Sequence, residues 1–343
     1  MLTKILCLIV ITMVFFLENS VADNIDGTVE GLTERPNLFP RFDRYRQSNH
    51  IHHQRRRGSN TSNQVQANDD VRADDDTTMS DDDRSDNDDV STSNETNNNE
   101  NKWFIPAVGS SWHWQLTGEV DTSHNVDIYD IDLYDSPFEL IENLQSDGKK
   151  VICYFSAGTY ENYRSDIDLF PSKTLGNIVG GWPDERWLDI RSSVVREIME
   201  MRLDLASDKG CDGVEPDNVD GYSNDTGFLL VAGDQLDYNR FLADAAHQRG
   251  LSIALKNNVE QAEALVDFFD FAINEECHEY DECDILKSFT DAGKAVFNAE
   301  YAQRYINNKQ KRSKMCSESF SLKMYTLILP LDLDGSFYMN CED

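Results

Sequence analysis

Short apolar runs alternate with longer amphipathic stretches from Trp103 to the end of the chain. Short apolar runs bounded by turn residues are typical of buried strands, whereas apolar residues three or four positions apart indicate one face of a helix. On these criteria the sequence predicts eight strands, at 112–116, 126–131, 151–155, 213–217, 252–257, 269–275, 295–301 and 325–329. It predicts helices between and after them, at 136–146, 192–209, 234–249, 261–268, 281–292 and 302–311.

Eight strands alternating with helices over this length predict an α/β fold, a single (β/α)8 TIM barrel. Glycines that suit the end of a helix stand between a predicted helix and the next strand at Gly148, Gly210, Gly250 and Gly293. An open doubly wound sheet is the alternative, but no Gly-x-Gly-x-x-Gly follows a predicted strand. The barrel is therefore the favoured architecture.

The chain before residue 102 has a different texture. Lys4, an apolar core over 5–17 and the small residues at 20–22 predict a signal peptide over 1–22. A membrane anchor is the alternative, although the apolar core is shorter than the ~20 residues of a spanning helix. Residues 23–101 have few aromatic or branched side chains and an Asp-rich run over 69–89, which predicts a disordered acidic linker. We expect a secreted, extracellular protein with its catalytic domain over 102–343.

The formal net charge of the 343-residue chain is −32. A nucleic-acid partner is not expected, because phosphate binding needs a basic stripe and the sequence contains none. No later segment is apolar enough to span a bilayer, so we expect no membrane partner after signal cleavage. We also expect the protein to be a monomer. A neutral or cationic polymer suits the charge better. Asn-x-Ser/Thr sequons at Asn60, Asn94 and Asn224 agree with passage through a glycosylating pathway.

Seven cysteines are present, of which Cys7 lies in the predicted signal peptide. An even number in a secreted chain indicates disulfides, although six cysteines allow about fifteen pairings. The expected pairs are Cys277 with Cys283, which would close a short loop; Cys153 with Cys211, which flank neighbouring strands; and Cys316 with Cys341. Metal-ligand spacings are lacking, so neither a metal nor another cofactor is expected.

Polar residues gather where the predicted strands end. The region 210–222 is the richest, with Glu215 and Asp217 two residues apart and hence on one face of a strand. A buried carboxylate is costly without a partner, and α/β barrels place catalytic acids at strand ends. An acidic loop that binds calcium is the alternative interpretation. Similar polar ends recur at Asp130, Asp132, Ser156, Asn218, Lys256, Asn257, Glu275, Glu276, Glu300 and Tyr301.

Two carboxylates facing each other across a groove lined with aromatic rings are the minimum for cleaving a glycosidic bond. Candidate platforms for sugar rings are Trp112, Trp114, Tyr129, Tyr154, Tyr160, Trp182 and Tyr301. A serine hydrolase is disfavoured because Ser156 lacks the Gly-x-Ser-x-Gly context. A hydrolase that binds magnesium or calcium through Asp and Glu remains an alternative.

The region from Trp112 onward resembles glycoside hydrolase family 114, the endo-α-1,4-polygalactosaminidase family. The similarity lies in Trp112-His-Trp-Gln-Leu-Thr-Gly118, Asp127-Ile-Tyr-Asp-Ile-Asp132, Cys153-Tyr-Phe-Ser-Ala-Gly158, Gly213-Val-Glu-Pro-Asp-Asn-Val-Asp-Gly221, Ala254-Leu-Lys-Asn257, Asn274-Glu-Glu-Cys277 and Ala299-Glu-Tyr301. The resemblance implies a (β/α)8 barrel, hydrolysis of α-1,4-linked galactosamine polymers, and Asp217 and Glu275 as the catalytic pair. The expected substrate-binding residues are Trp114, Asp130, Asp132, Tyr154, Asn218, Asp220, Lys256, Asn257, Glu276, Glu300 and Tyr301. A catalytically silent, carbohydrate-binding barrel is the competing hypothesis.

Strand alternation separates the two glutamates of the sixth barrel strand. Phe271, Ile273 and Glu275 share one face, and Glu276 lies on the other. We therefore expect only Glu275 to point into the barrel mouth, with Glu276 facing the helices or capping the loop.

Overall fold

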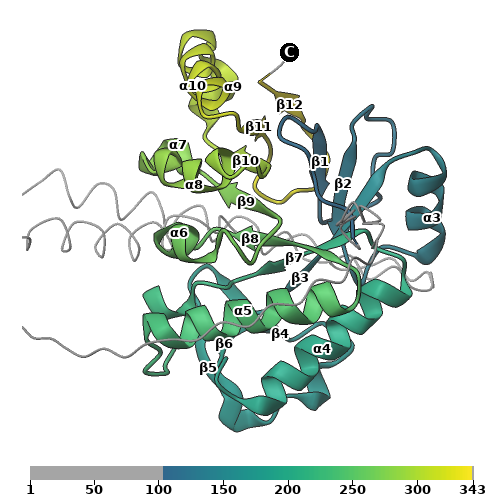
Figure 1. The fold of residues 1–343 in the computed structure, drawn as a ribbon, viewed down its shortest axis with the longest axis vertical. Coiled ribbons are helices and arrows are strands. Elements are labelled where there is room, and N and C mark those ends of the chain that lie inside the picture. The colour runs from purple at the N-terminus through teal and green to yellow at the C-terminus, as the bar shows by residue number, and fades with distance from the viewer. Residues whose placement is uncertain (1–102, 342–343) are drawn as a thin grey trace, which may run out of the picture. The chain divides into compact units, whose positions relative to one another are not determined.

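The computed structural model describes residues 103–341. Its main sheet has nine strands in the order β1-β2-β3-β7-β8-β9-β10-β11-β12. The first eight pair in parallel, at the places where the sequence predicts strands. They are β1 (Trp112–Gln115), β2 (Ile128–Asp132), β3 (Lys150–Ser156), β7 (Gly213–Asp217), β8 (Ser252–Lys256), β9 (Phe271–Glu275), β10 (Val296–Glu300) and β11 (Tyr325–Ile328). The sheet curls with helices around it, so the expected TIM-barrel-like α/β fold is confirmed (Figure 1).

The helices follow the strands. They are α3 (Phe138–Ser146), α4 (Ser193–Asp208), α5 (Ala232–Gln248), α6 (Ala262–Leu265), α7 (Cys277–Tyr280), α8 (Lys287–Asp291), α9 (Gln303–Asn307) and α10 (Lys309–Ser321). The helix predicted over 302–311 is wrong in its bounds, because Asn308 ends α9 and caps α10 by accepting a hydrogen bond from the Lys311 amide at 3.1 Å. Helices predicted at 261–268 and 281–292 are each a 3-10 turn followed by a short helix.

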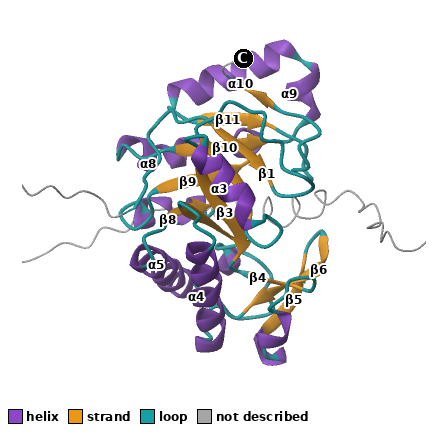
Figure 2. Cartoon of the chain, turned by 90° about the vertical axis from the view of Figure 1, so that its right-hand side faces the viewer, coloured by secondary structure: helices purple, strands orange, loops and turns teal. Residues whose placement is uncertain are grey.

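A small antiparallel sheet was not predicted. Its strands β4 (Thr159–Glu161), β5 (Leu175–Val179) and β6 (Trp182–Leu188) lie between β3 and α4, in the order β4-β6-β5. Figure 2 shows this sheet set apart from the barrel strands. Two register shifts between β5 and β6 break the alternation of apolar and polar residues that marks a strand in the sequence.

Side chains of the barrel strands divide into an inner and an outer layer. Trp112, Ile152, Phe271, Ile273 and Phe297 pack together inside the barrel. Neighbouring residues on the same strands belong to the larger core between sheet and helices, among them Val151, Cys153, Ile253, Ala272 and Val296. Glu275 therefore has the inward parity that the alternation predicts.

An irregular segment lies between the last and first parallel strands. Among the described residues no ladder joins β11 directly to β1; instead β12 (Met339–Asn340) pairs antiparallel with β11. The backbone amides of Leu116 and Thr117 donate to the carbonyl oxygen of Leu333 at 3.0 and 3.2 Å. The chain after β11 thus bridges the seam and reaches the barrel mouth.

The three disulfides are those expected from the sequence: Cys153–Cys211, Cys277–Cys283 and Cys316–Cys341. No helix in the described part of the chain combines the length and apolarity needed to cross a membrane. The predicted signal peptide and acidic linker lie outside the described residues.

Candidate active site

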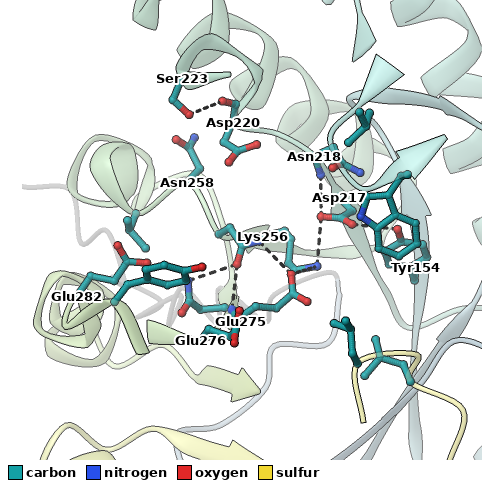
Figure 3. Close-up of a pocket in the computed structure, with 18 of the residues that line it drawn as sticks. Tyr154, Asp217, Asn218, Asp220, Ser223, Lys256, Asn258, Glu275, Glu276 and Glu282 are labelled. Carbon is teal, nitrogen blue, oxygen red and sulfur yellow. Dashed lines mark hydrogen bonds and ion pairs between the residues drawn. The ribbon is translucent and has the colours of Figure 1, made fainter. Parts of the chain in front are cut away.

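A pocket of about 200 Å³ opens at the carboxyl ends of β1, β3, β7, β8 and β9 (Figure 3). Its walls also include the β5–β6 hairpin and the chain that follows β11. The lining residues are Trp114, Leu116, Tyr154, Val179, Trp182, Glu185, Asp217, Asn218, Asp220, Tyr222, Ser223, Lys256, Asn257, Asn258, Val259, Glu260, Asn274, Glu275, Glu276, Tyr280, Glu282, Leu331 and Leu333.

Lys256 lies at the centre of the pocket floor and is only 2% exposed. Its Nζ is 3.1 Å from Glu215, 3.2 Å from Asp217 and 3.3 Å from Glu275, and 4.8 Å from the centre of the Trp114 ring. Burial alone would lower the pKa of this lysine. The three carboxylates outweigh burial and raise the pKa of Lys256 well above its ordinary value, so the ammonium stays charged.

Asp217 is held at the end of β7 by three donors. Its Oδ1 accepts from the Asn218 amide at 2.7 Å and from Lys256, and its Oδ2 accepts from the Tyr154 hydroxyl at 2.9 Å. Asn218 has a left-handed φ of 61° and approaches the turn after β3 so closely that a Cβ at Gly158 would lie 1.7 Å from its carbonyl oxygen. The glycine that ends the Cys153–Gly158 motif thus makes room for the turn that orients Asp217.

Glu275 is held in a matching way at the end of β9. Its Oε1 accepts from the Tyr301 hydroxyl at 2.5 Å, and its Oε2 accepts from the Asn257 side chain at 3.1 Å and lies against Lys256. Asn257 also accepts from the Glu275 amide at 3.0 Å. Both sides of this carboxylate are therefore positioned by neighbouring strands.

Beneath these groups lie two further acids, Glu215 and Asp130, both without solvent exposure. Glu215 accepts from the Trp114 indole at 3.0 Å and lies against Lys256. Burial raises the pKa of Glu215 to about 7, with Lys256 opposing the shift and Asp217 adding to it. Burial, followed by the charge of Glu215, raises the pKa of Asp130 well above its ordinary value.

The pocket walls are acidic. Seven lining side chains are carboxylic acids, and Lys256 is the one Lys or Arg among these described lining residues. Burial and then the charge of Asp217 raise the pKa of Asp220 to about 6. Burial, Glu260 and Asp220 raise the pKa of Glu282 to about 7. The site therefore attracts cations, although some of its carboxyl groups remain partly protonated near neutral pH.

Nine of the residues predicted for the site line this pocket: Trp114, Tyr154, Asp217, Asn218, Asp220, Lys256, Asn257, Glu275 and Glu276. Glu276 lines the pocket, whereas strand alternation predicted that it faces the helices or caps the loop. It leaves β9 with a left-handed φ of 59°, so strand parity no longer applies. The other predicted residues lie around the pocket rather than in its wall.

Those residues are placed by their partners. Asp132 binds Arg164 through both oxygens at 2.9 and 2.7 Å. Glu300 faces outward and accepts from the His278 amide at 2.9 Å, and burial raises its pKa to about 8. Tyr301 touches the site through Glu275, and Asp130 lies in the layer below.

Sequence reasoning did not select several lining residues, including Glu185, Tyr222, Glu260, Tyr280 and Glu282. They come from the β5–β6 hairpin, from short 3-10 turns, from the end of α7 and from the loop after it, where no strand-end pattern applies. One signal was the length of chain between the third predicted strand and the next helix, over 156–191, because connections that long in a barrel are usually functional.

Metal-ligand atoms of Cys277, His278 and Cys283 lie within 4.8 Å of one another. The two sulfurs are joined in a disulfide, however, and so cannot act as thiolate ligands. This group is not a metal site in the oxidised protein.

Comparison with known families agrees with the geometry. The model of glycoside-hydrolase family GH114 matches residues 92–343. The chain belongs to this family. It is a glycoside hydrolase, and its acidic pocket lies at the barrel end where such enzymes place their active sites.

Solved structures similar to this GH114 chain include the crystal structure of Aspergillus fumigatus Ega3 in complex with galactosamine. That chain is 42% identical with a TM-score of 0.66, and the match covers 69% of this chain and 97% of Ega3. The glycoside hydrolase domain of PelA from Pseudomonas aeruginosa has 15% identity and a TM-score of 0.52, covering 67% of this chain and 97% of that domain. The PelA likeness shows the fold alone. No curated protein sequence matches this chain.

Proposed function

We propose that this GH114 chain is a secreted endo-hydrolase of α-1,4-linked galactosamine polymers, with Asp217 and Glu275 as its paired carboxylates. The observation that carries the proposal is the placement of these two acids, from β7 and β9, on either side of Lys256 at the floor of an acidic pocket. Ega3, at 42% identity, is described in a complex with galactosamine.

Lys256 sets an upper limit on the separation of the two carboxylates. Because Lys256 Nζ is 3.2 Å from Asp217 Oδ1 and 3.3 Å from Glu275 Oε2, these two oxygens are at most the sum of those distances, about 6.5 Å, apart. Carboxyl groups about 5–5.5 Å apart are typical of retaining enzymes, whereas inverting enzymes need about 6.5–9.5 Å. The limit applies to the two oxygens that contact Lys256 and reaches only the lower end of the inverting range, and we propose retention of configuration on that basis.

The two carboxylates have similar sets of hydrogen-bond donors, which do not distinguish their roles. We therefore assign the role of each from the family resemblance. Asp217 is the nucleophile that attacks the anomeric carbon, and Glu275 gives its proton to the leaving oxygen and later takes one from water. Lys256 contacts both groups and stabilises negative charge on either.

The charge of the pocket supports the substrate class. A galactosamine unit without its acetyl group carries an ammonium, and the seven lining acids attract such a polymer at low salt. Secretion is proposed from the residues at the start of the chain, with the signal peptide over 1–22 and the globular domain over 102–343.

The alternatives differ in what they require of the site. A metal-dependent hydrolase would place a cation where carboxylates converge, but Lys256 Nζ already lies at that point. A silent carbohydrate-binding barrel needs no second acid, and such copies commonly lack one. Both Asp217 and Glu275 are present and held by donors.

The test is product analysis after incubation with a partly deacetylated α-1,4-galactosamine polymer and, in parallel, with chitosan. We expect oligosaccharides from the first polymer, unchanged activity after treatment with a chelator, and no products from Asp217→Asn at a near-normal melting temperature. Binding without cleavage would support the silent barrel. If Asp217→Asn has a clearly lower melting temperature and loses activity only in proportion to its unfolded fraction, Asp217 has a structural role.

A further inference from the structure

Glu215 is a buried acid at the centre of the site that the reaction does not use directly. It is 0% exposed, lies beneath the pocket and is not among the residues that line it. Its Oε2 accepts from Trp114 of β1 at 3.0 Å, and its Oε1 lies 3.1 Å from Lys256 of β8. It is therefore the one of the three carboxylates around Lys256 that a sugar in the pocket does not contact.

Asp130 of β2 is the neighbour of Glu215 and has no solvent exposure either. Neither of its oxygens has a hydrogen-bond partner among the described residues, and the charged groups that act on it are Glu215 and Lys256. Two buried carboxyl groups in contact cannot both be ionised, because the like charges repel in a medium of low dielectric constant. Glu215 has Trp114 and Lys256 as donors whereas Asp130 has none, so Asp130 is the member expected to carry the proton.

Lys256 needs a partner that does not change during the reaction. In the proposed first step a bond forms from Asp217 to the anomeric carbon, the glycosidic bond breaks, and the proton of Glu275 moves to the leaving oxygen. Asp217 thereby loses its negative charge and Glu275 gains one, with no change in the total. Lys256, at 3.2 and 3.3 Å from the two, would follow the charge unless another group held it.

We propose that Asp130 and Glu215 are positioning residues for catalysis: ionised Glu215 is the counter-ion whose charge does not change during the reaction and which keeps Lys256 midway between Asp217 and Glu275, and Asp130 is the neutral donor that orients Glu215. The inference rests on the proposed function. Besides Trp114 and Lys256, the titratable groups that act on Glu215 are Asp130, Asp217 on its own strand and Tyr301 of β10. Asp130 is affected by Glu215 and Lys256.

The experiment compares Glu215→Gln, Asp130→Asn and Asp130→Leu with the wild type on the galactosamine polymer. Glu215→Gln is expected to lower kcat by about 10- to 100-fold, the range for loss of a partner that orients a catalytic group, with KM nearly unchanged. Lys256 would then be held by Asp217 and Glu275 alone, so the pH dependence of kcat should differ from that of the wild type.

Asp130 is tested by conservative rescue. The asparagine amide of Asp130→Asn donates to Glu215 as the protonated acid does, so kcat should stay within about threefold of wild type. Asp130→Leu has a similar size and no donor, and should resemble Glu215→Gln. The matched control is Asp270→Asn, a buried acid that accepts from Trp103 at the opposite end of β9. It should lower the melting temperature and leave kcat and the pH profile unchanged.

The outcomes separate the inference from the proposed function. A wild type that releases no product overturns both. An active wild type with normal kcat in Glu215→Gln, or with a raised KM and normal kcat, overturns the inference alone. If Glu215→Gln does not fold, the Asp130 pair decides: equal impairment of Asp130→Asn and Asp130→Leu means that Asp130 acts as an anion, and the inference is wrong.

Discussion

Lys256→Met removes the charge at the centre of the site and keeps a side chain of similar length. The ammonium is 2% exposed and contacts three carboxylates within 3.3 Å. Breaking a buried ion pair by removing one partner costs about 3–5 kcal/mol, because the remaining charge is left buried without compensation. For a domain of this size about 1 kcal/mol corresponds to about 2–4 °C, so the melting temperature should fall by about 6–20 °C at pH 8.

The loss should depend on pH. In the wild type the pKa of Lys256 lies well above its ordinary value of 10.5, so the stability it contributes is fully present below about that pH and is constant between pH 5 and 8. Without the cation, the folded protein binds protons on the crowded carboxyls more tightly than the unfolded chain does. Stability of the variant is therefore lost as pH rises, and its deficit against wild type should be larger at pH 8 than at pH 5.

The assay is thermal unfolding by circular dichroism at pH 5, 6, 7 and 8, with Lys209→Met as the control. Lys209 Nζ donates to the carbonyl oxygens of Leu133 and Ser136 at 2.6 and 2.7 Å, and the described residues form no ion pair with it. Its removal should lower the melting temperature by a similar amount at every pH. The reasoning is refuted if Lys256→Met loses less than about 2 °C, or loses equally at pH 5 and pH 8.

Glu275→Gln is expected to lower kcat by about 10²- to 10⁴-fold and to abolish the high-pH limb of the rate profile, whereas Glu276→Gln should act mainly on stability. Near-normal turnover by Glu275→Gln with an inactive Glu276→Gln would reverse the assignment. Replacing Cys277 and Cys283 together by serine should cost about 2 kcal/mol in urea unfolding, and a peptide map of the native protein that shows Cys277 free would contradict the disulfide. A chain that begins at residue 101 should fold and cleave soluble substrate; insoluble expression would move the domain boundary. Proton NMR of the first product should show the α anomer, and a β anomer would indicate inversion.

The alternation of short apolar runs with longer amphipathic stretches was enough to place the eight barrel strands. The strands are buried on both faces, so their apolar runs stand out from the polar turns, and the glycines after the helices precede four of the eight strands. All four of these glycines have a positive φ, between 73° and 80°. Strand parity also put Glu275 on the inner face, because side chains alternate with a period of two.

Elements in which apolar residues do not recur with a regular period were not predicted from the sequence. The β4–β6 sheet has two register shifts, and α10 begins at a capping asparagine inside what looks like one helix. Glu276 follows the last strand residue with a left-handed backbone, which returns its side chain to the pocket wall. At these points the chain departs from a regular period, so neither the strand pattern nor the helix pattern predicts its path.

The partners of each acid at a strand end depend on the tertiary structure. In the sequence Asp132, Glu300 and Asp217 are equivalent, each a carboxylate where a strand ends. In the fold Arg164 binds Asp132, an outward position buries Glu300 under α7, and Lys256 and Tyr154 hold Asp217 in the pocket. The strand pattern in the sequence indicated where the acids lie along the strands. Only the fold decided which of them share a lysine, because Coulomb energy and hydrogen bonding depend on distances between residues far apart in the chain.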